Sequence, residues 1–148
     1  MTFAITGANG FLGVHIIHHL LCNGHNVLAI SRPGASSSEF ERIAQSYDFS
    51  AEENDQLTWC YCELYDVDGL QEIFTKADYV MQLAGTISYL QRDYEKMLLV
   101  NQEYTANVVN ACLGSDIKKL LYCSSIAAIT KTNNGDTVRE DIEWNNEV

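Results

Sequence analysis

The chain has 148 residues, 47% of them hydrophobic, and a formal net charge of −11. This length allows one domain with a sizeable core, and the hydrophobic content excludes a disordered chain. The acidic balance argues against nucleic acid or an anionic membrane surface as a partner. We find no signal peptide before the first apolar run and no apolar run as long as a membrane span, so we expect a cytoplasmic protein.

A glycine-rich turn follows the first short apolar run. Residues 3–5 form that run and residues 11–22 carry apolar side chains at helical spacing, so residues 6–13 (T-G-A-N-G-F-L-G) connect a strand to a helix. Glycines let a phosphate approach the backbone, and the unpaired amides at a helix start favour a negative group. A dinucleotide diphosphate is the usual occupant, and a tight turn without a ligand is the alternative. The residues expected to contact the diphosphate are Gly7, Asn9, Gly10, Phe11, Leu12 and Gly13.

Strands alternate with helices along the rest of the chain. The predicted strands cover residues 26–30, 57–64, 79–83 and 119–123, and the predicted helices cover residues 39–47, 67–76 and 93–113. This alternation predicts parallel βαβ units with right-handed crossovers. We therefore expect an α/β fold of the Rossmann type, with a doubly wound parallel sheet in the order 3-2-1-4-5. A ligand is expected across the carboxyl ends of the first and fourth strands, where the order reverses.

The end of the second predicted strand indicates which dinucleotide is bound. An acidic residue there would hold the ribose 2′-hydroxyl of NAD, but Ser31 and Arg32 occupy this place. A guanidinium forms forked hydrogen bonds to a phosphate. We therefore expect Arg32 to bind a 2′-phosphate and NADP(H) to be preferred over NAD(H). A surface arginine without a ligand is the alternative.

Five segments carry motifs that occur together in one protein family. They are Thr6 to Gly13, Glu63-Leu64, Leu83-Ala84-Gly85, Val100-Asn101 with the helix residues that follow, and Leu121 to Ala128. In order and spacing these segments resemble the extended short-chain dehydrogenases/reductases of the NAD-dependent epimerase/dehydratase superfamily. The most similar members are dihydroflavonol-4-reductase-like, cinnamoyl-CoA-reductase-like and 3β-hydroxysteroid-dehydrogenase-like enzymes. Gln82 departs from the family pattern, which commonly has histidine there.

The resemblance also implies which further residues lie at the cofactor. It places Glu63 and Leu64 beside the adenine, and it adds Leu83, Ala84, Gly85 and Asn101 to the cofactor site. Asn101 is a polar residue within an apolar helical stripe. We therefore also expect its side chain to tie down the loop after the fourth strand through backbone hydrogen bonds.

The family's reaction is a hydride transfer. A tyrosine, whose pKa a lysine lowers, exchanges a proton with the substrate oxygen, and a serine forms a hydrogen bond to the same oxygen. By resemblance Ser125 is the serine, with Ser124 as the runner-up, and a hydroxyl at the carboxyl end of a strand suits this role. None of the eight tyrosines has a lysine four residues later. We therefore expect residues 1–148 to be an incomplete amino-terminal part of an NADP-dependent oxidoreductase, truncated before the later strands and the substrate region. Such a part binds the nucleotide and turns over no substrate.

Two other functions stay open. One is a non-catalytic NAD(P)-binding redox sensor, in which the tyrosine and lysine are dispensable, and the other is a nucleotide-sugar epimerase or dehydratase. The expected partner is a small-molecule substrate. The family resemblance also implies a homodimer through the long helix after the fourth strand.

No metal site is expected. His15, His18 and His19 share a helix face, but no nearby acid or cysteine completes a ligand shell. The five cysteines lack the spacing of a zinc site or a disulfide framework and are expected to be free thiols.

Overall fold

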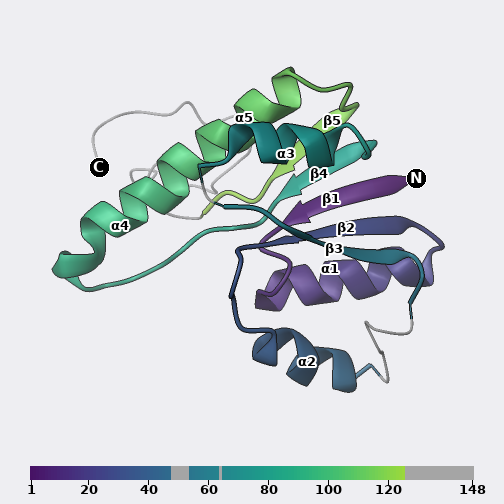
Figure 1. The fold of residues 1–148 in the computed structure, drawn as a ribbon. Helices are drawn as coiled ribbons and strands as arrows, with labels where there is room; N and C mark the ends of the chain where they lie inside the picture. Colours follow the sequence, from purple (N-terminus) through teal and green to yellow (C-terminus); the bar gives the residue numbers. More distant parts are fainter. Residues whose placement is uncertain (48–53, 64, 126–148) are drawn as a thin grey trace, which may run out of the picture.

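The computed structural model describes residues 1–47, 54–63 and 65–125. Five parallel strands form one sheet in the order β3-β2-β1-β4-β5 (Figure 1). The strands are β1 (Thr2–Thr6), β2 (Asn26–Ser31), β3 (Leu57–Tyr61), β4 (Tyr79–Gln82) and β5 (Lys119–Tyr122). The predicted fold class and strand order are confirmed.

Helices cover both faces of this sheet (Figure 1). They are α1 (Phe11–Cys22), α2 (Ser38–Gln45), α3 (Val67–Phe74), α4 (Tyr94–Leu98) and α5 (Tyr104–Leu113). A short 3₁₀ turn, η1 (Gln91–Asp93), precedes α4, and a π-helical turn, η2 (Leu99–Glu103), joins α4 to α5. None of the described helices is both long and apolar enough to cross a membrane.

Strand β1 shows why the core divides into two clusters. Its side chains alternate between the faces of the sheet, so Phe3 and Ile5 pack with α1 and α2 while Ala4 packs with α3 and α5. All three are nearly or fully buried. A strand buried on both faces reads as a continuous apolar run, which is the pattern of residues 3–5.

Two predicted elements differ from the structure by more than two residues at an end or in the type of helix. The third strand ends at Tyr61 rather than at residue 64, because the chain turns there toward Asp66, whose carboxylate accepts the Gly69 amide at 2.8 Å and caps α3. The predicted helix over residues 93–113 is helical throughout, but its middle widens into η2. Helical periodicity alone does not reveal such a turn.

All five cysteines lie in the described residues, and none forms a disulfide. Cys62, 4% exposed, packs between the sheet and α3. Burial, together with the charges of Asp66 and Glu63, raises its pKa from 9.0 to about 11. The thiol therefore stays protonated in the folded protein at pH values where the unfolded chain has lost the proton.

This burial predicts alkaline destabilisation. The contribution of Cys62 is complete below pH 9 and is lost as the pH rises to 11, by at most about 1.4 kcal/mol per pH unit. Urea unfolding of Cys62→Ser should therefore show a shallower decline over this range than the unchanged chain. The control is Cys22→Ser, at an exposed thiol, which should keep the original slope. Equal slopes for Cys62→Ser and the unchanged chain would contradict the assignment.

Candidate dinucleotide-binding site

The carboxyl ends of the parallel strands meet at one edge of the sheet (Figure 1). A cavity of about 320 Å³ lies at this edge. The strand order reverses between β1 and β4, which is where doubly wound folds bind their ligands. Four segments line the cavity. They are the turn after β1 (Gly7, Ala8, Asn9 and Gly10), the end of β2 and its loop (Ile30, Ser31, Arg32 and Ala35), the segment after β4 (Leu83, Ala84, Gly85 and Thr86), and one helix face (Lys96, Val100 and Tyr104).

The three glycines of the turn differ in what a side chain at each position would contact. Gly7 has a φ of 69°, and a Cβ there would lie 2.7 Å from the Ala84 amide nitrogen. A Cβ at Gly13 would lie 2.4 Å from the Gly7 carbonyl oxygen. Gly10 is exposed, and the nearest atom to its hypothetical Cβ is 3.2 Å away. At Gly7 and Gly13 a Cβ would therefore collide with backbone atoms, whereas Gly10 is exposed and a Cβ there would meet only the Gly7 carbonyl oxygen. The approach of a phosphate to this turn stays a prediction.

The start of α1 suits an anion. Gly10 is the residue before its first turn and supplies no side-chain cap, and the first turn holds no acidic residue. The Gly10 amide donates to the Gly7 carbonyl at 3.0 Å. The following first-turn amides have no intrahelical acceptor, and the helix dipole favours negative charge beside them.

Asn9 joins the turn to the end of β2 and has an unused acceptor. Its side-chain Nδ2 donates to Ser31 Oγ at 2.8 Å. Its Oδ1 is buried and accepts no hydrogen bond from the described residues. Since a buried acceptor without a donor costs free energy, this atom indicates a ligand donor such as a ribose hydroxyl.

A buried polar network fixes the wall that follows β4. Thr6 and Gln82 are the buried polar side chains of the described core, 0% and 1% exposed. The Thr6 hydroxyl donates to Gln82 Oε1 and accepts the amides of Leu83 and Ala84, both at 3.2 Å. Gln82 Nε2 donates to the Ala84 carbonyl at 3.0 Å and to Thr105 Oγ1 at 3.2 Å. Strands β1 and β4 and helix α5 thereby hold this wall in one position.

Asn101 fastens the next part of the same wall. Its Oδ1 accepts the Thr86 amide and its Nδ2 donates to the Thr86 carbonyl, both at 2.8 Å. The predicted role of Asn101 in tying down this loop is confirmed. The residue lies within the π-helical turn η2, a feature often found at functional sites.

The charge around the cavity is opposite to that of the chain. The chain has 20 acidic residues and 9 lysines and arginines, yet the lining contains Arg32 and Lys96 and no acidic residue. Tyr104 also lines the cavity and is 5% exposed. Burial raises the pKa of Tyr104 to about 12, partly offset by Arg32, so its phenol stays neutral. The cavity therefore favours an anionic ligand.

The family model described as "NAD dependent epimerase/dehydratase family" matches residues 3–146. The chain belongs to this family.

Relatives of the chain include reductases, dehydrogenases and an epimerase. It is 25% identical to a putative dihydroflavonol 4-reductase of Synechocystis over 95% of the chain and 37% of that protein. It is 26% identical to cinnamoyl-CoA reductase 1 of Oryza sativa over 95% of the chain and 39% of that protein. The chain thus spans about two-fifths of the length of these relatives.

A solved structure of UDP-glucuronic acid 4-epimerase from Bacillus cereus, in complex with NAD, shares the fold. The TM-score is 0.78 with 22% identity, and the match covers 97% of this chain and 45% of the epimerase chain. As a member of an NAD-dependent family, the chain has residues that fit a dinucleotide: a turn with an exposed glycine, and the unused acceptor of Asn9.

The structure brings together seven of the predicted cofactor residues as cavity lining: Gly7, Asn9, Gly10, Arg32, Leu83, Ala84 and Gly85. Five others lie outside the lining: Phe11, Leu12, Gly13, Glu63 and Asn101. Leu64 lies outside the described residues. Ser124 and Ser125 are exposed and follow β5 at the same edge of the sheet, but they do not line the cavity.

Sequence reasoning missed the helix face formed by Lys96, Val100 and Tyr104. Their spacing of four residues places them on one side of a helix. That spacing was visible in the sequence, but nothing in it showed that this side borders the glycine turn about 90 positions earlier.

Proposed function

We propose that this chain is the NADP(H)-binding part of an oxidoreductase that transfers hydride between the nicotinamide cofactor and a carbonyl or alcohol substrate. The observation that carries the proposal is the cavity where β1 and β4 end, which is lined by the glycine turn and Arg32 and by no acidic residue. The similarity to a dihydroflavonol 4-reductase and a cinnamoyl-CoA reductase supports the reaction class.

Each lining segment has a role in this proposal. The first-turn amides and dipole of α1 bind the diphosphate, and Asn9 Oδ1 accepts a ribose hydroxyl. Arg32, at the end of β2, binds the 2′-phosphate through forked hydrogen bonds. The bound nicotinamide supplies or accepts the hydride.

Ser125 is proposed to donate a hydrogen bond to the substrate oxygen, with Ser124 as the alternative. Both follow β5, whose carboxyl end lies at the cavity edge of the sheet. The 148 residues contain no Tyr-x-x-x-Lys pair. We therefore propose that the chain alone binds the cofactor without turning over a substrate. A cytoplasmic location, a small-molecule substrate for the whole protein and a homodimer through α4 and α5 belong to the same proposal.

Titration calorimetry with NADPH and NADH tests the cofactor assignment. The unchanged chain should bind NADPH more tightly, because only NADPH offers Arg32 a phosphate. Arg32→Ala should weaken NADPH binding about tenfold and leave NADH binding nearly unchanged, as expected for one charge-assisted contact.

The matched control is Arg42→Ala, at an exposed arginine paired with Glu39 on α2. It should change neither affinity. Equal affinities for the two cofactors would overturn the NADP preference, and failure to bind either one would overturn the proposed function.

A further inference from the structure

Among the described residues, two of the three lysines and arginines without an ion pair line the cavity. Of its nine lysines and arginines, Lys131 and Arg139 lie outside the described residues, which leaves seven. Four of these seven form ion pairs with neighbouring carboxylates: Arg42, Lys76, Arg92 and Lys118. The three without an ion pair among the described residues are Arg32, Lys96 and Lys119. Arg32 and Lys96 both line the cavity.

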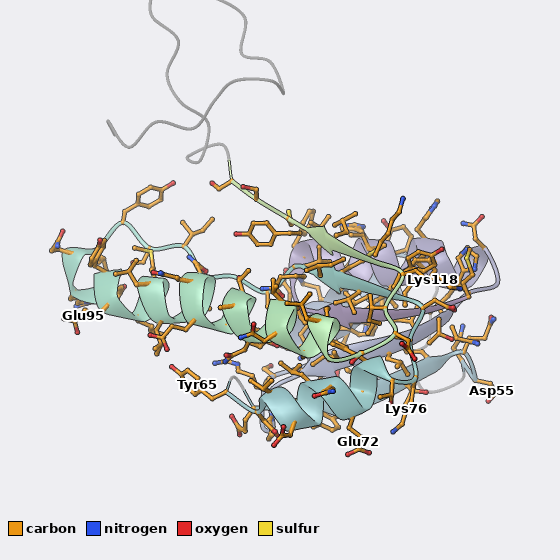
Figure 2. All side chains as sticks on the ribbon, turned by 90° about the horizontal axis from the view of Figure 1, so that it is seen from above. Asp55, Tyr65, Glu72, Lys76, Glu95 and Lys118 are labelled. Carbon is orange, nitrogen blue, oxygen red and sulfur yellow. The ribbon has the colours of Figure 1, made fainter. Side chains whose placement is uncertain are left out.

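Figure 2 shows two of the paired lysines on the outside of the domain, Lys76 beside Glu72 and Lys118 on the edge far from α4. In a chain with more than twice as many acidic as basic residues, most exposed cations find a carboxylate. Two cations that border one cavity without such a partner are therefore available to a ligand.

The helix geometry brings Lys96 to the cavity. Helix α4 extends beyond the carboxyl ends of the strands (Figure 1), and the neighbouring Glu95 marks its far end in Figure 2. Lys96 lies eight residues before Tyr104, about 12 Å along the helix axis. In a regular α-helix, each step of four residues overshoots a full turn by about 40°. The wider π-helical turn η2 reduces this drift, so Lys96, Val100 and Tyr104 all border the cavity.

We infer that Lys96 binds a phosphate group of the dinucleotide from the helix side of the cavity. This inference rests on the proposed function and adds a contact that comes from neither the glycine turn nor the end of β2. A phosphate monoester carries close to two negative charges at neutral pH, and Arg32 alone neutralises one. At the diphosphate, the amides at the start of α1 contribute a partial positive charge of about half an elementary charge. At either group a lysine supplies the missing positive charge.

The test is calorimetric titration of NADPH and NADH into Lys96→Met, Lys96→Arg and Lys119→Met. Lys96→Met should raise the dissociation constant of NADPH about tenfold. Lys96→Arg should retain most of the affinity, because the charge is kept. Lys119→Met removes the same charge from an exposed position on β5 outside the cavity, and it should leave both affinities unchanged.

The two cofactors identify the phosphate. If Lys96→Met loses affinity for NADPH alone, Lys96 binds the 2′-phosphate. If it loses affinity equally for both cofactors, Lys96 binds the diphosphate. Unchanged affinities in Lys96→Met, or an equal loss in Lys119→Met, overturn the inference while the proposed function stands. An unchanged chain that binds neither cofactor overturns both. Equal thermal midpoints for Lys96→Met and the unchanged chain establish that the exposed substitution leaves the fold intact.

Discussion

Gly7→Ala is expected to lower the free energy of unfolding by roughly 3 kcal/mol and to abolish measurable cofactor binding. Two costs add at this position. The backbone has a φ of 69°, where a Cβ costs about 1–2 kcal/mol, and that Cβ would lie within 3 Å of backbone atoms of Leu83 and Ala84. Backbone cannot give way as a flexible side chain can, so overpacking adds about 1–3 kcal/mol. Urea unfolding at neutral pH measures the loss.

Gly24→Ala is the matched control for this prediction. Gly24 has a φ of 72°, but no atom lies within 4 Å of its hypothetical Cβ. Its substitution should cost about 1 kcal/mol, the conformational part alone. The difference between the two variants isolates the contact between the turn and the segment after β4. If both variants lost the same free energy, the close approach of these two segments would not exist in solution.

Gln82→Leu is expected to destabilise the fold by about 3 kcal/mol. The substitution removes three hydrogen bonds from a site that is 1% exposed. It leaves the Thr6 hydroxyl hydrogen, the Ala84 carbonyl and Thr105 Oγ1 without the partner each now has. Because Gln82 also positions the cavity wall, NADPH affinity should fall even where the variant remains folded.

The control for the glutamine prediction is Gln91→Leu, at an exposed position in η1. A glutamine in water exchanges its hydrogen bonds with solvent, so this variant should change the free energy of unfolding by at most about 0.5 kcal/mol. A loss of less than 1 kcal/mol in Gln82→Leu would mean that the network contributes little to the stability of the fold.

The fold was predictable because its signals are local. A period of two or a continuous apolar run predicts a strand, and helical spacing predicts a helix, within windows of fewer than twenty residues. Handedness and connection rules then reduce alternating strands and helices to a few sheet orders, among which 3-2-1-4-5 is typical of a strand, glycine turn and helix at the start of the chain. The errors arose at residues 62 and 63, which follow β3 before the Asp66 cap of α3, and at the turn η2, which helical spacing does not reveal.

The residues of the candidate site likewise divide into those that the sequence predicts and those that it does not. Gly7, Asn9, Gly10 and Arg32 were predictable because they belong to short motifs placed at strand ends. The hydrogen bond between Thr6 and Gln82 was not predictable. The two residues are 76 positions apart in the sequence, and the pairing of their strands depends on the whole sheet. Gln82 reads in the sequence only as a departure from the family's histidine, whereas in the structure it is a fully bonded part of the wall.

The amino-acid sequence alone predicts the alternation of strands and helices, the glycine turn and the guanidinium at the end of β2, because each depends on neighbouring residues. The tertiary contacts determine that Gly7 packs against Ala84 and that Lys96 lines the same cavity as the glycine turn. These properties depend on distances between segments about 75 to 90 positions apart, which the packing of helices on both faces of the sheet sets.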